Sequence, residues 1–194
     1  MAWGAVLAGF AAVIGHAAIR TEDGREVDLE LFRATNIGHG PRADRYFAGV
    51  TELGSLYASA AASTVIAVTG RRRAALSSMA AACATWSLLQ GVKRVVDRPR
   101  PSDADPHGTR LLIARPMATS WPSSHPAVLT TFTRIASREL GVGAGVRAAL
   151  TALDLSVAGS RVYLGVHYPS DVVSGLLLGR AIARWWPGRG ASRG

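Results

Sequence analysis

Three clusters of polar residues in this sequence carry the side chains needed to hold and transfer a phosphoryl group. Residues 93–101, KRVVDRPRP, supply fixed positive charge, and guanidinium and ammonium groups bind the oxygens of an oxyanion. Residues 121–126, WPSSHP, form a proline-bracketed turn whose hydroxyl and backbone N–H groups can cradle a phosphate where a helix begins. Residues 160–171, SRVYLGVHYPSD, combine an arginine, a histidine and an aspartate. We therefore expect a phosphate-binding site with a nucleophile close to it.

The histidine of the third cluster, His167, is the candidate nucleophile. Pro169 favours a helix start just after it, which puts Asp171 near the start of that helix. A carboxylate there can accept a hydrogen bond from one ring nitrogen of His167 and so raise the nucleophilicity of the other nitrogen. His125 lies at the mouth of the turn formed by the second cluster. All three clusters fall at the ends of predicted helices, on one side of a bundle that we expect to lie in a membrane. We therefore expect their side chains to lie close together.

These clusters resemble the three signatures of the type-2 phosphatidic acid phosphatase superfamily, which also includes the vanadium haloperoxidases. The family patterns are K-x6-R-P, P-S-G-H and S-R-x5-H-x3-D, and residues 160–171 match the third in full. Residues 93–101 match the first, and residues 122–125 match the second with Ser124 in place of glycine. If that position required a positive φ, serine would cost about 1 kcal/mol or more, although its backbone N–H would remain available.

The resemblance implies a role for each matched residue. His167 would form a phosphohistidine, Asp171 would orient it, and His125 would protonate the leaving oxygen and then activate water. The residues implied to bind the phosphoryl oxygens and stabilise the transition state are Lys93, Arg100, Ser123, Ser124 and Arg161. The family uses no metal ion for phosphatase activity, and we expect no metal and no other cofactor here.

Helices must position these clusters. The candidate helices are residues 1–19, 46–69, 74–92, 126–140, 148–160 and 172–186. The stretch 74–92 holds nineteen uncharged residues between basic flanks, which is the length that a bilayer core requires. Glu52 and Asp154 fall within two other stretches, and ionisable groups at such depth face a bundle interior or a polar cavity, so we expect both helices to pack against protein and not lipid. The sequence thus predicts an all-α fold, a membrane-embedded bundle of about six helices with its catalytic loops on one face.

We expect a single phosphatase domain over residues 1–194. Residues 1–45 would form an N-terminal helix and an amphipathic surface segment, 46–186 the catalytic helical core, and 187–194 a basic tail. The basic residues expected on the cytoplasmic side are Arg71, Arg72, Arg73, Arg138, Arg147, Arg189 and Arg193. The chain is therefore expected to be a multi-pass protein of the cell membrane, with its active site facing the extracytoplasmic side.

The net charge of the chain limits the classes of partner that it is expected to bind. A formal net charge of +9, from 22 basic and 13 acidic residues, predicts attraction to nucleic acid, a phospholipid surface or a phosphorylated substrate. The sequence shows no basic face with stacking aromatics, so nucleic acid is not the expected partner. A metal hydrolase could use His107, His125, His167 and Asp171, but the neighbouring cations would repel a divalent ion. Cys83 is the only cysteine, which excludes an internal disulfide and a cysteine metal cluster.

We predict a metal-independent phosphatase that hydrolyses a lipid phosphomonoester or a polyprenyl diphosphate. Its expected partners are this lipid-phosphate substrate and the membrane bilayer. A polyprenyl-phosphate sugar phosphatase acting on phosphoribose in cell-wall synthesis is the alternative. Vanadate-dependent halide oxidation would use the same cradle, but the short chain and its apolar helices favour a lipid substrate. A basic membrane-surface or nucleic-acid binding protein without catalysis is the alternative from another class. The motifs do not choose between lipids, and the oligomeric state is left open.

Overall fold

The structure, a computed structural model, describes residues 2–188, and these residues form helices joined by turns and loops, with no β-strand among them. The helices are α1 (Ala2–Arg20), α2 (Glu22–Thr35), α3 (Pro41–Glu52), α4 (Leu56–Val68), α5 (Arg72–Val96), α6 (Pro101–Ala104), α7 (Ser124–Leu140), α8 (Ala144–Tyr163) and α9 (Pro169–Trp185). The predicted all-α fold is confirmed. The basic tail predicted for residues 187–194 lies outside the described residues from position 189 onward.

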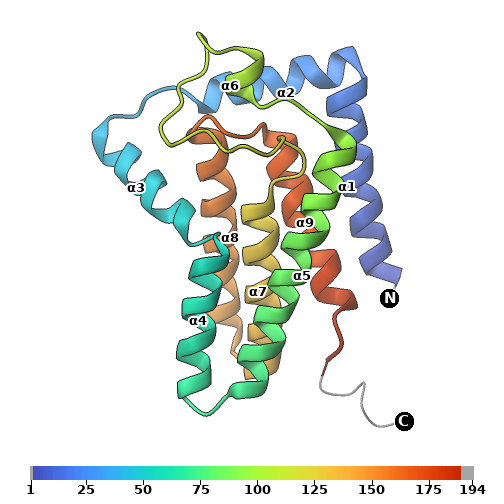
Figure 1. The fold of residues 1–194 in the computed structure, drawn as a ribbon, viewed down its shortest axis with the longest axis vertical. Helices are drawn as coiled ribbons and strands as arrows, with labels where there is room; N and C mark the ends of the chain where they lie inside the picture. Colours follow the sequence, from blue (N-terminus) through green and yellow to red (C-terminus); the bar gives the residue numbers. More distant parts are fainter. Residues whose placement is uncertain (1, 189–194) are drawn as a thin grey trace.

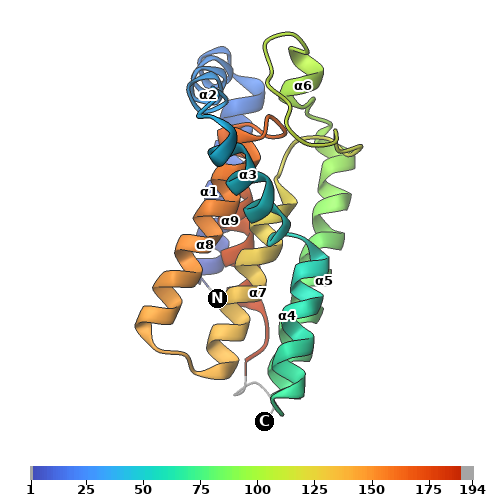
Figure 2. The same ribbon diagram turned by 90° about the vertical axis from the view of Figure 1, so that its left-hand side faces the viewer.

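Most of the helices run side by side, and the others gather toward one end (Figure 1). In Figure 1, α1, α4, α5, α7, α8 and α9 run roughly along the vertical axis, whereas α2, α3 and α6 lie toward the top. The loop between α6 and α7 lies at the same end, and the view turned by 90° shows the same separation (Figure 2). The N-terminal ends of α7 and α9 and the C-terminal ends of α5 and α8 therefore meet at the upper end.

Local sequence sets several helix boundaries. The Thr21 hydroxyl accepts a hydrogen bond from the Gly24 N–H (3.1 Å) at the start of α2. The Ser55 hydroxyl accepts one from the Ala58 N–H (3.1 Å) at the start of α4. Such caps satisfy backbone donors that have no partner within the helix. Prolines at the first positions of α3, α6 and α9 start these helices, because their fixed φ suits a helix and their missing N–H costs nothing there.

Helix α7 lies at the centre of the packing. Nearly its whole length is buried, and it contacts α5, α8 and α9. One apolar cluster joins Ala82 of α5 to Val128 and Phe132 of α7. Helix α9 also packs closely on α7, at Gly179, where an added Cβ would lie only 2.6 Å from the Ala127 carbonyl oxygen. This close packing fixes the upper ends of the helices, and with them the polar clusters, relative to one another.

The prediction of one helix over residues 46–69 is wrong, because the chain breaks between α3 and α4. Gly54 lies in the break, where an added Cβ would come within 2.9 Å of the His125 Cβ, so the turn is packed against the start of α7. Glu52 ends α3 and is exposed, and it lines a polar cavity, which is one of the two settings expected for it. Asp154 is only 1% exposed and accepts a hydrogen bond from a threonine hydroxyl of α7 at 3.1 Å, as expected for a carboxylate packed against protein.

Among the described helices, only α1 is both long and apolar enough to cross a membrane, with a mean hydropathy of 1.7. Residues 74–92, which have the length that a bilayer core requires, do not meet this hydropathy criterion. Helix α5 does cover that stretch, but the serine, threonine and glutamine side chains along it lower its hydropathy. Most of α1 faces outward, since only 22% of its apolar window is buried in the protein. The number of spans therefore stays a prediction.

Candidate active site

A cavity of about 780 Å³ lies where the three polar clusters meet. The predicted site residues in its lining are Lys93, Arg100, Ser124, His125, Arg161 and His167. They come from the C-terminal ends of α5 and α8, from the start of α7 and from the loops that follow α5 and α8. Asp171 lies behind His167, and Ser123 is buried outside the lining. The structure thus brings both histidines and three cationic side chains to one cavity.

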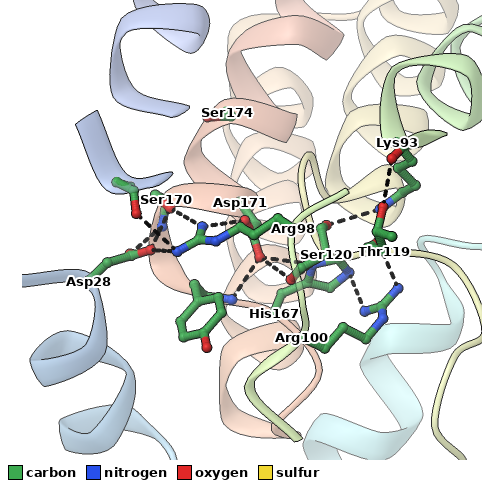
Figure 3. A network of polar contacts seen from close by, with 12 residues as sticks. Asp28, Lys93, Arg98, Arg100, Thr119, Ser120, His167, Ser170, Asp171 and Ser174 are labelled. Carbon is green, nitrogen blue, oxygen red and sulfur yellow. Dashed lines mark hydrogen bonds and ion pairs between the residues drawn. The ribbon is translucent and has the colours of Figure 1, made fainter. Parts of the chain in front are cut away.

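His167 lies in the turn between α8 and α9 and is only 2% exposed. Its Nδ1 atom is 3.3 Å from Asp171 Oδ2, and its Nε2 atom is 3.2 Å from Arg100 Nη1 (Figure 3). A guanidinium can only donate, so Nε2 must accept, and the ring proton is then on Nδ1, where the carboxylate accepts it. The two neighbours therefore select the tautomer in which the lone pair of Nε2 faces the cavity.

Asp171 is fully buried and receives donors on both carboxylate oxygens. Oδ1 accepts a hydrogen bond from Arg98 Nη1 at 2.7 Å. Oδ2 accepts from the Ser120 hydroxyl and from the Tyr168 backbone N–H at 2.9 Å, and it also faces His167. Because Asp171 lies in the first turn of α9, free N–H groups and the helix dipole favour its negative charge. The carboxylate is held in one orientation, with Oδ2 directed at His167.

The loop that precedes α7 holds two of the cations. Lys93 Nζ donates to the carbonyl oxygens of Thr119 (2.7 Å) and Ser120 (3.0 Å). Arg100 Nε donates to the Ala118 carbonyl oxygen at 2.7 Å. These carbonyls position the cations without neutralising them, and the ion pairs formed within residues 2–188 include neither Lys93 nor Arg100. The cavity therefore carries surplus positive charge, which suits an oxyanion ligand.

Arg161, in the last turn of α8, adds a third cation. It is 3% exposed, and its Nη1 donates to Thr51 Oγ1 at 2.7 Å. Its Nε atom is buried and has no hydrogen-bond partner among the described residues. A buried charged donor without an acceptor is costly, and an oxyanion in the cavity would satisfy it.

Burial and the neighbouring cations keep His167 neutral. Burial first, and then the charges of Arg100, Lys93 and Arg161, hold the pKa of His167 well below its usual 6.5. Burial also lowers the pKa of Arg100 to about 10, so its guanidinium stays charged at neutral pH. A neutral imidazole beside a charged guanidinium keeps the lone pair that a nucleophile needs.

The second cluster, residues 121–126, leads into the first turn of α7, and this turn positions His125. His125 is half-buried there and lines the cavity. Ser124 is the first residue of α7, and Asp97 is the only described non-glycine residue with a positive φ, so the penalty considered for serine does not arise. Ser123 is fully buried, and its backbone N–H donates to the Asp171 carbonyl oxygen at 3.0 Å. Ser123 therefore ties the start of α7 to α9 from behind the cavity.

Four residues that support the site were not expected from the sequence, and three of them contact predicted site residues directly. Arg98 and Ser120 bind Asp171, Thr51 binds Arg161, and Asp28 binds Arg98. Arg98 lies inside the first cluster and Ser120 directly precedes the second, so proximity to the motifs was a usable signal for both. Asp28 and Thr51 lie far from the motifs in sequence, and nothing in the local pattern marks them.

The donors at the cavity do not suit a metal ion. Residues 2–188 contain no group of three or more His, Cys, Asp or Glu side chains placed to hold one. His107, one of the four ligands considered for a metal hydrolase, is exposed in the loop after α6. The ammonium and guanidinium groups that line the cavity would repel a divalent cation.

The sequence of the chain is similar to those of known proteins. The family model of the PAP2 superfamily matches residues 72–189. A decaprenylphosphoryl-5-phosphoribose phosphatase from Mycobacterium tuberculosis is 34% identical over 117 residues, which cover 60% of this chain and 62% of that protein. The protein of the same name from Mycolicibacterium smegmatis is 35% identical over 115 residues, 59% of each chain. The match thus spans less than two thirds of the length of these relatives.

Two solved structures share the fold. A transmembrane PAP2-type phosphatidylglycerolphosphate phosphatase from Bacillus subtilis superposes with a TM-score of 0.83 and 22% identity, over 95% of this chain and 94% of that one. LpxE from Aquifex aeolicus superposes with a TM-score of 0.71 and 26% identity, over 80% of this chain and 92% of that one.

Proposed function

The chain belongs to the PAP2 superfamily, and from this premise we propose that it is a metal-independent phosphatase of a lipid phosphomonoester or polyprenyl diphosphate. The observation that carries the proposal is the setting of His167. Its Nε2 faces the cationic cavity, while its Nδ1 lies 3.3 Å from Asp171 Oδ2. His125 supplies a second imidazole to the same cavity. A neutral imidazole backed by a carboxylate and surrounded by unpaired cations suits phosphoryl transfer to nitrogen.

In the first step, the Nε2 lone pair of His167 attacks phosphorus. A P–N bond forms and the P–O bond to the leaving group breaks, giving a phosphohistidine. His125 enters this step as an imidazolium, because the negative charge of the bound phosphoryl group offsets the neighbouring cations, and it donates its proton to the departing oxygen. The leaving group departs as an alcohol or, from a diphosphate, as a lipid monophosphate. Asp171 accepts the hydrogen bond of Nδ1–H and so stabilises the positive charge that develops on the ring.

In the second step, water replaces the histidine. His125, now neutral, takes a proton from the water as its oxygen attacks phosphorus, and the P–N bond breaks to release inorganic phosphate and restore His167. Three cations, Lys93, Arg100 and Arg161, bind the phosphoryl oxygens through both steps and stabilise the charge of the transition state. The backbone N–H of Ser124 at the start of α7 adds a donor, while Ser123 supports the cradle from behind.

Among lipid phosphates, we favour a polyprenylphosphoryl sugar phosphate such as the decaprenylphosphoryl-5-phosphoribose in the name of the mycobacterial relatives. The cavity lining also holds Glu52, Gln90 and Arg115, which can exchange hydrogen bonds with sugar hydroxyls. Tyr57 and Trp86 add apolar surface to the same lining for the polyprenyl tail. The reaction would remove the terminal phosphomonoester and leave the phosphodiester to the polyprenyl chain intact.

We further propose that the chain crosses the cell membrane several times, with the cavity on the extracytoplasmic side. The turn with Arg71, Arg72 and Arg73 and the turn between α7 and α8 lie at the end of the bundle away from the cavity (Figure 1). The positive-inside tendency assigns this end to the cytoplasm. Large apolar side chains of α1, including Trp3, Phe10 and Val13, are 59–68% exposed, as lipid-facing residues would be.

Phosphate release by the detergent-purified protein tests the proposed function. The substrates are dioctanoyl phosphatidic acid, phosphatidylglycerol phosphate, undecaprenyl diphosphate and decaprenylphosphoryl-5-phosphoribose in mixed micelles. We expect the highest kcat/KM on the phosphoribose lipid, full activity with excess chelator, and inhibition by vanadate. His167→Ala should abolish release, while His107→Ala, an exposed histidine outside the cavity lining, should leave it unchanged.

Two results would overturn the proposal. Wild-type activity in His167→Ala would remove the nucleophile and the phosphohistidine with it. Release from none of the four lipids, together with tight binding to anionic vesicles, would favour a basic membrane-surface protein without catalysis.

A further inference from the structure

Helix α2 reaches the catalytic carboxylate through one buried arginine. Arg98 is 7% exposed and donates from Nη1 to Asp171 Oδ1 and from Nη2 to Asp28 Oδ2, each at 2.7 Å. Asp28 is 4% exposed, and it lies on α2, outside the residues 72–189 that match the superfamily. Figure 3 shows Arg98 between Asp28 on one side and Asp171 on the other. A residue outside the family match is thus linked to the candidate nucleophile through two side chains.

Asp28 also caps α9. Its Oδ1 accepts a hydrogen bond from the Ser170 backbone N–H at 2.8 Å, and its Oδ2 accepts one from the Ser170 hydroxyl at 2.6 Å. Ser170 is the second residue of α9, so its N–H has no acceptor within the helix. Because Asp171 is the next residue and His167 lies three positions before Ser170, this contact anchors the backbone that carries both.

The Arg98 guanidinium binds two carboxylates at once, and this arrangement affects the hydrogen bond between Asp171 and His167. With Asp28 charged, Arg98 engages only Oδ1 of Asp171, and Oδ2 remains directed at the imidazole. The guanidinium is also fixed against the Tyr168 ring, 4.2 Å from its centroid. If the charge of Asp28 were removed, the full attraction of Arg98 would fall on Asp171, and a bidentate pair would draw Oδ2 away from Nδ1–H.

We propose that Asp28 is a positioning residue of the active site, acting through Arg98 and Asp171 on His167. The inference rests on the proposed function. It makes α2 a part of the catalytic machinery, whereas the sequence predicted an amphipathic surface segment. Asp28 touches no substrate, and its effect is on the rate of phosphoryl transfer to His167 and only slightly on substrate binding.

The test compares Asp28→Asn with Glu30→Gln, a matched loss of one carboxylate charge from an exposed position of the same helix. The readouts are kcat and KM for dioctanoyl phosphatidic acid, with each variant's folded fraction measured by thermal unfolding. We expect Asp28→Asn to lower kcat per folded molecule about 10- to 100-fold while KM stays within about threefold, and Glu30→Gln to match wild type. An unchanged kcat in Asp28→Asn would overturn the proposal.

A double-mutant cycle shows whether Asp28 acts through Asp171. If it does, Asp28→Asn adds little to the loss caused by Asp171→Asn, whereas multiplying losses contradict the relay. Should Asp28→Asn yield no folded protein, Arg98→Lys takes its place, since lysine keeps the charge but cannot reach both carboxylates as a fork. Failure of the proposed function would look different: wild type would release no phosphate, or His167→Ala would keep its activity.

Discussion

Arg100 Nη1 lies 3.2 Å from His167 Nε2, so a cation of the cavity contacts the very nitrogen that is the candidate nucleophile. The guanidinium is held there by carbonyl oxygens, with Val166 accepting from Nη1 and Ala118 accepting from Nε at 2.7 Å. We infer that an incoming phosphoryl oxygen takes the place of Nε2 as the acceptor for Nη1. The same arginine then fixes the tautomer of His167 before substrate binds and stabilises the phosphoryl charge afterwards.

Replacing this arginine should therefore affect both binding and rate. Arg100→Lys keeps the charge but loses the planar fork, so we expect kcat to fall roughly 10²- to 10³-fold and KM to rise. Steady-state phosphate release measures both constants. Arg94→Lys changes an exposed arginine of α5 in the same way and should behave as wild type. A similar loss in both variants would show that the cavity position of Arg100 is irrelevant.

Asp171→Asn should leave the fold intact and nearly stop the reaction. An asparagine can donate to His167 Nδ1 and favour the wrong tautomer, and loss of such a carboxylate from a catalytic triad costs about 10⁴-fold in kcat. Rapid-quench trapping of an acid-labile radiolabelled phosphoenzyme follows this step directly. Asp97→Asn, at an exposed position after α5, is the control and should label normally. Normal labelling of Asp171→Asn would contradict the orienting role.

The lowered pKa of His167 sets the direction of a pH effect. Protonation removes the Nε2 lone pair, and burial with the surrounding cations postpones that protonation to pH values well below 6.5. The acid limb of kcat/KM from this group should therefore lie well below pH 6.5. Arg100→Gln removes one of the charges that lower the pKa, so its acid limb should move toward higher pH. An unshifted limb in that variant would argue against His167 as the titrating group.

The contact between α7 and α9 at Gly179 predicts a steric effect on stability. A Cβ at this position would lie 2.6 Å from the Ala127 carbonyl oxygen, so Gly179→Ala should push the helices apart and destabilise the fold by about 1–3 kcal/mol. Gly159→Ala on α8 is the matched control, because a Cβ there has nothing within 4 Å. It should be neutral or stabilising by about 0.5–1 kcal/mol. Thermal unfolding in detergent compares the two, and equal stability would refute the close approach.

The sequence by itself determined the helical class of the protein, most of its helices and the three clusters that line the cavity. These features are local. Where a helix starts, as at Pro169, and where it ends depend on residues within a few positions of that point. The order of the motifs can be read directly from the sequence. The expectation that Asp171 would face His167 is of this kind, since both lie within one turn of the start of α9.

Only the tertiary structure decided how distant parts of the chain complete the site. Asp28 meets Arg98 and Ser170 across 70 and 142 positions, and Thr51 meets Arg161 across 110. Neither residue has a local pattern to mark it, because a buried polar side chain is satisfied by whichever donor the packing of α2 and α3 brings to it. The break at Gly54 has the same origin, since close packing of that turn against His125 outweighs the helical preference of the surrounding residues. Short-range periodicity carries no information about such contacts, whose partners are chosen when the helices pack.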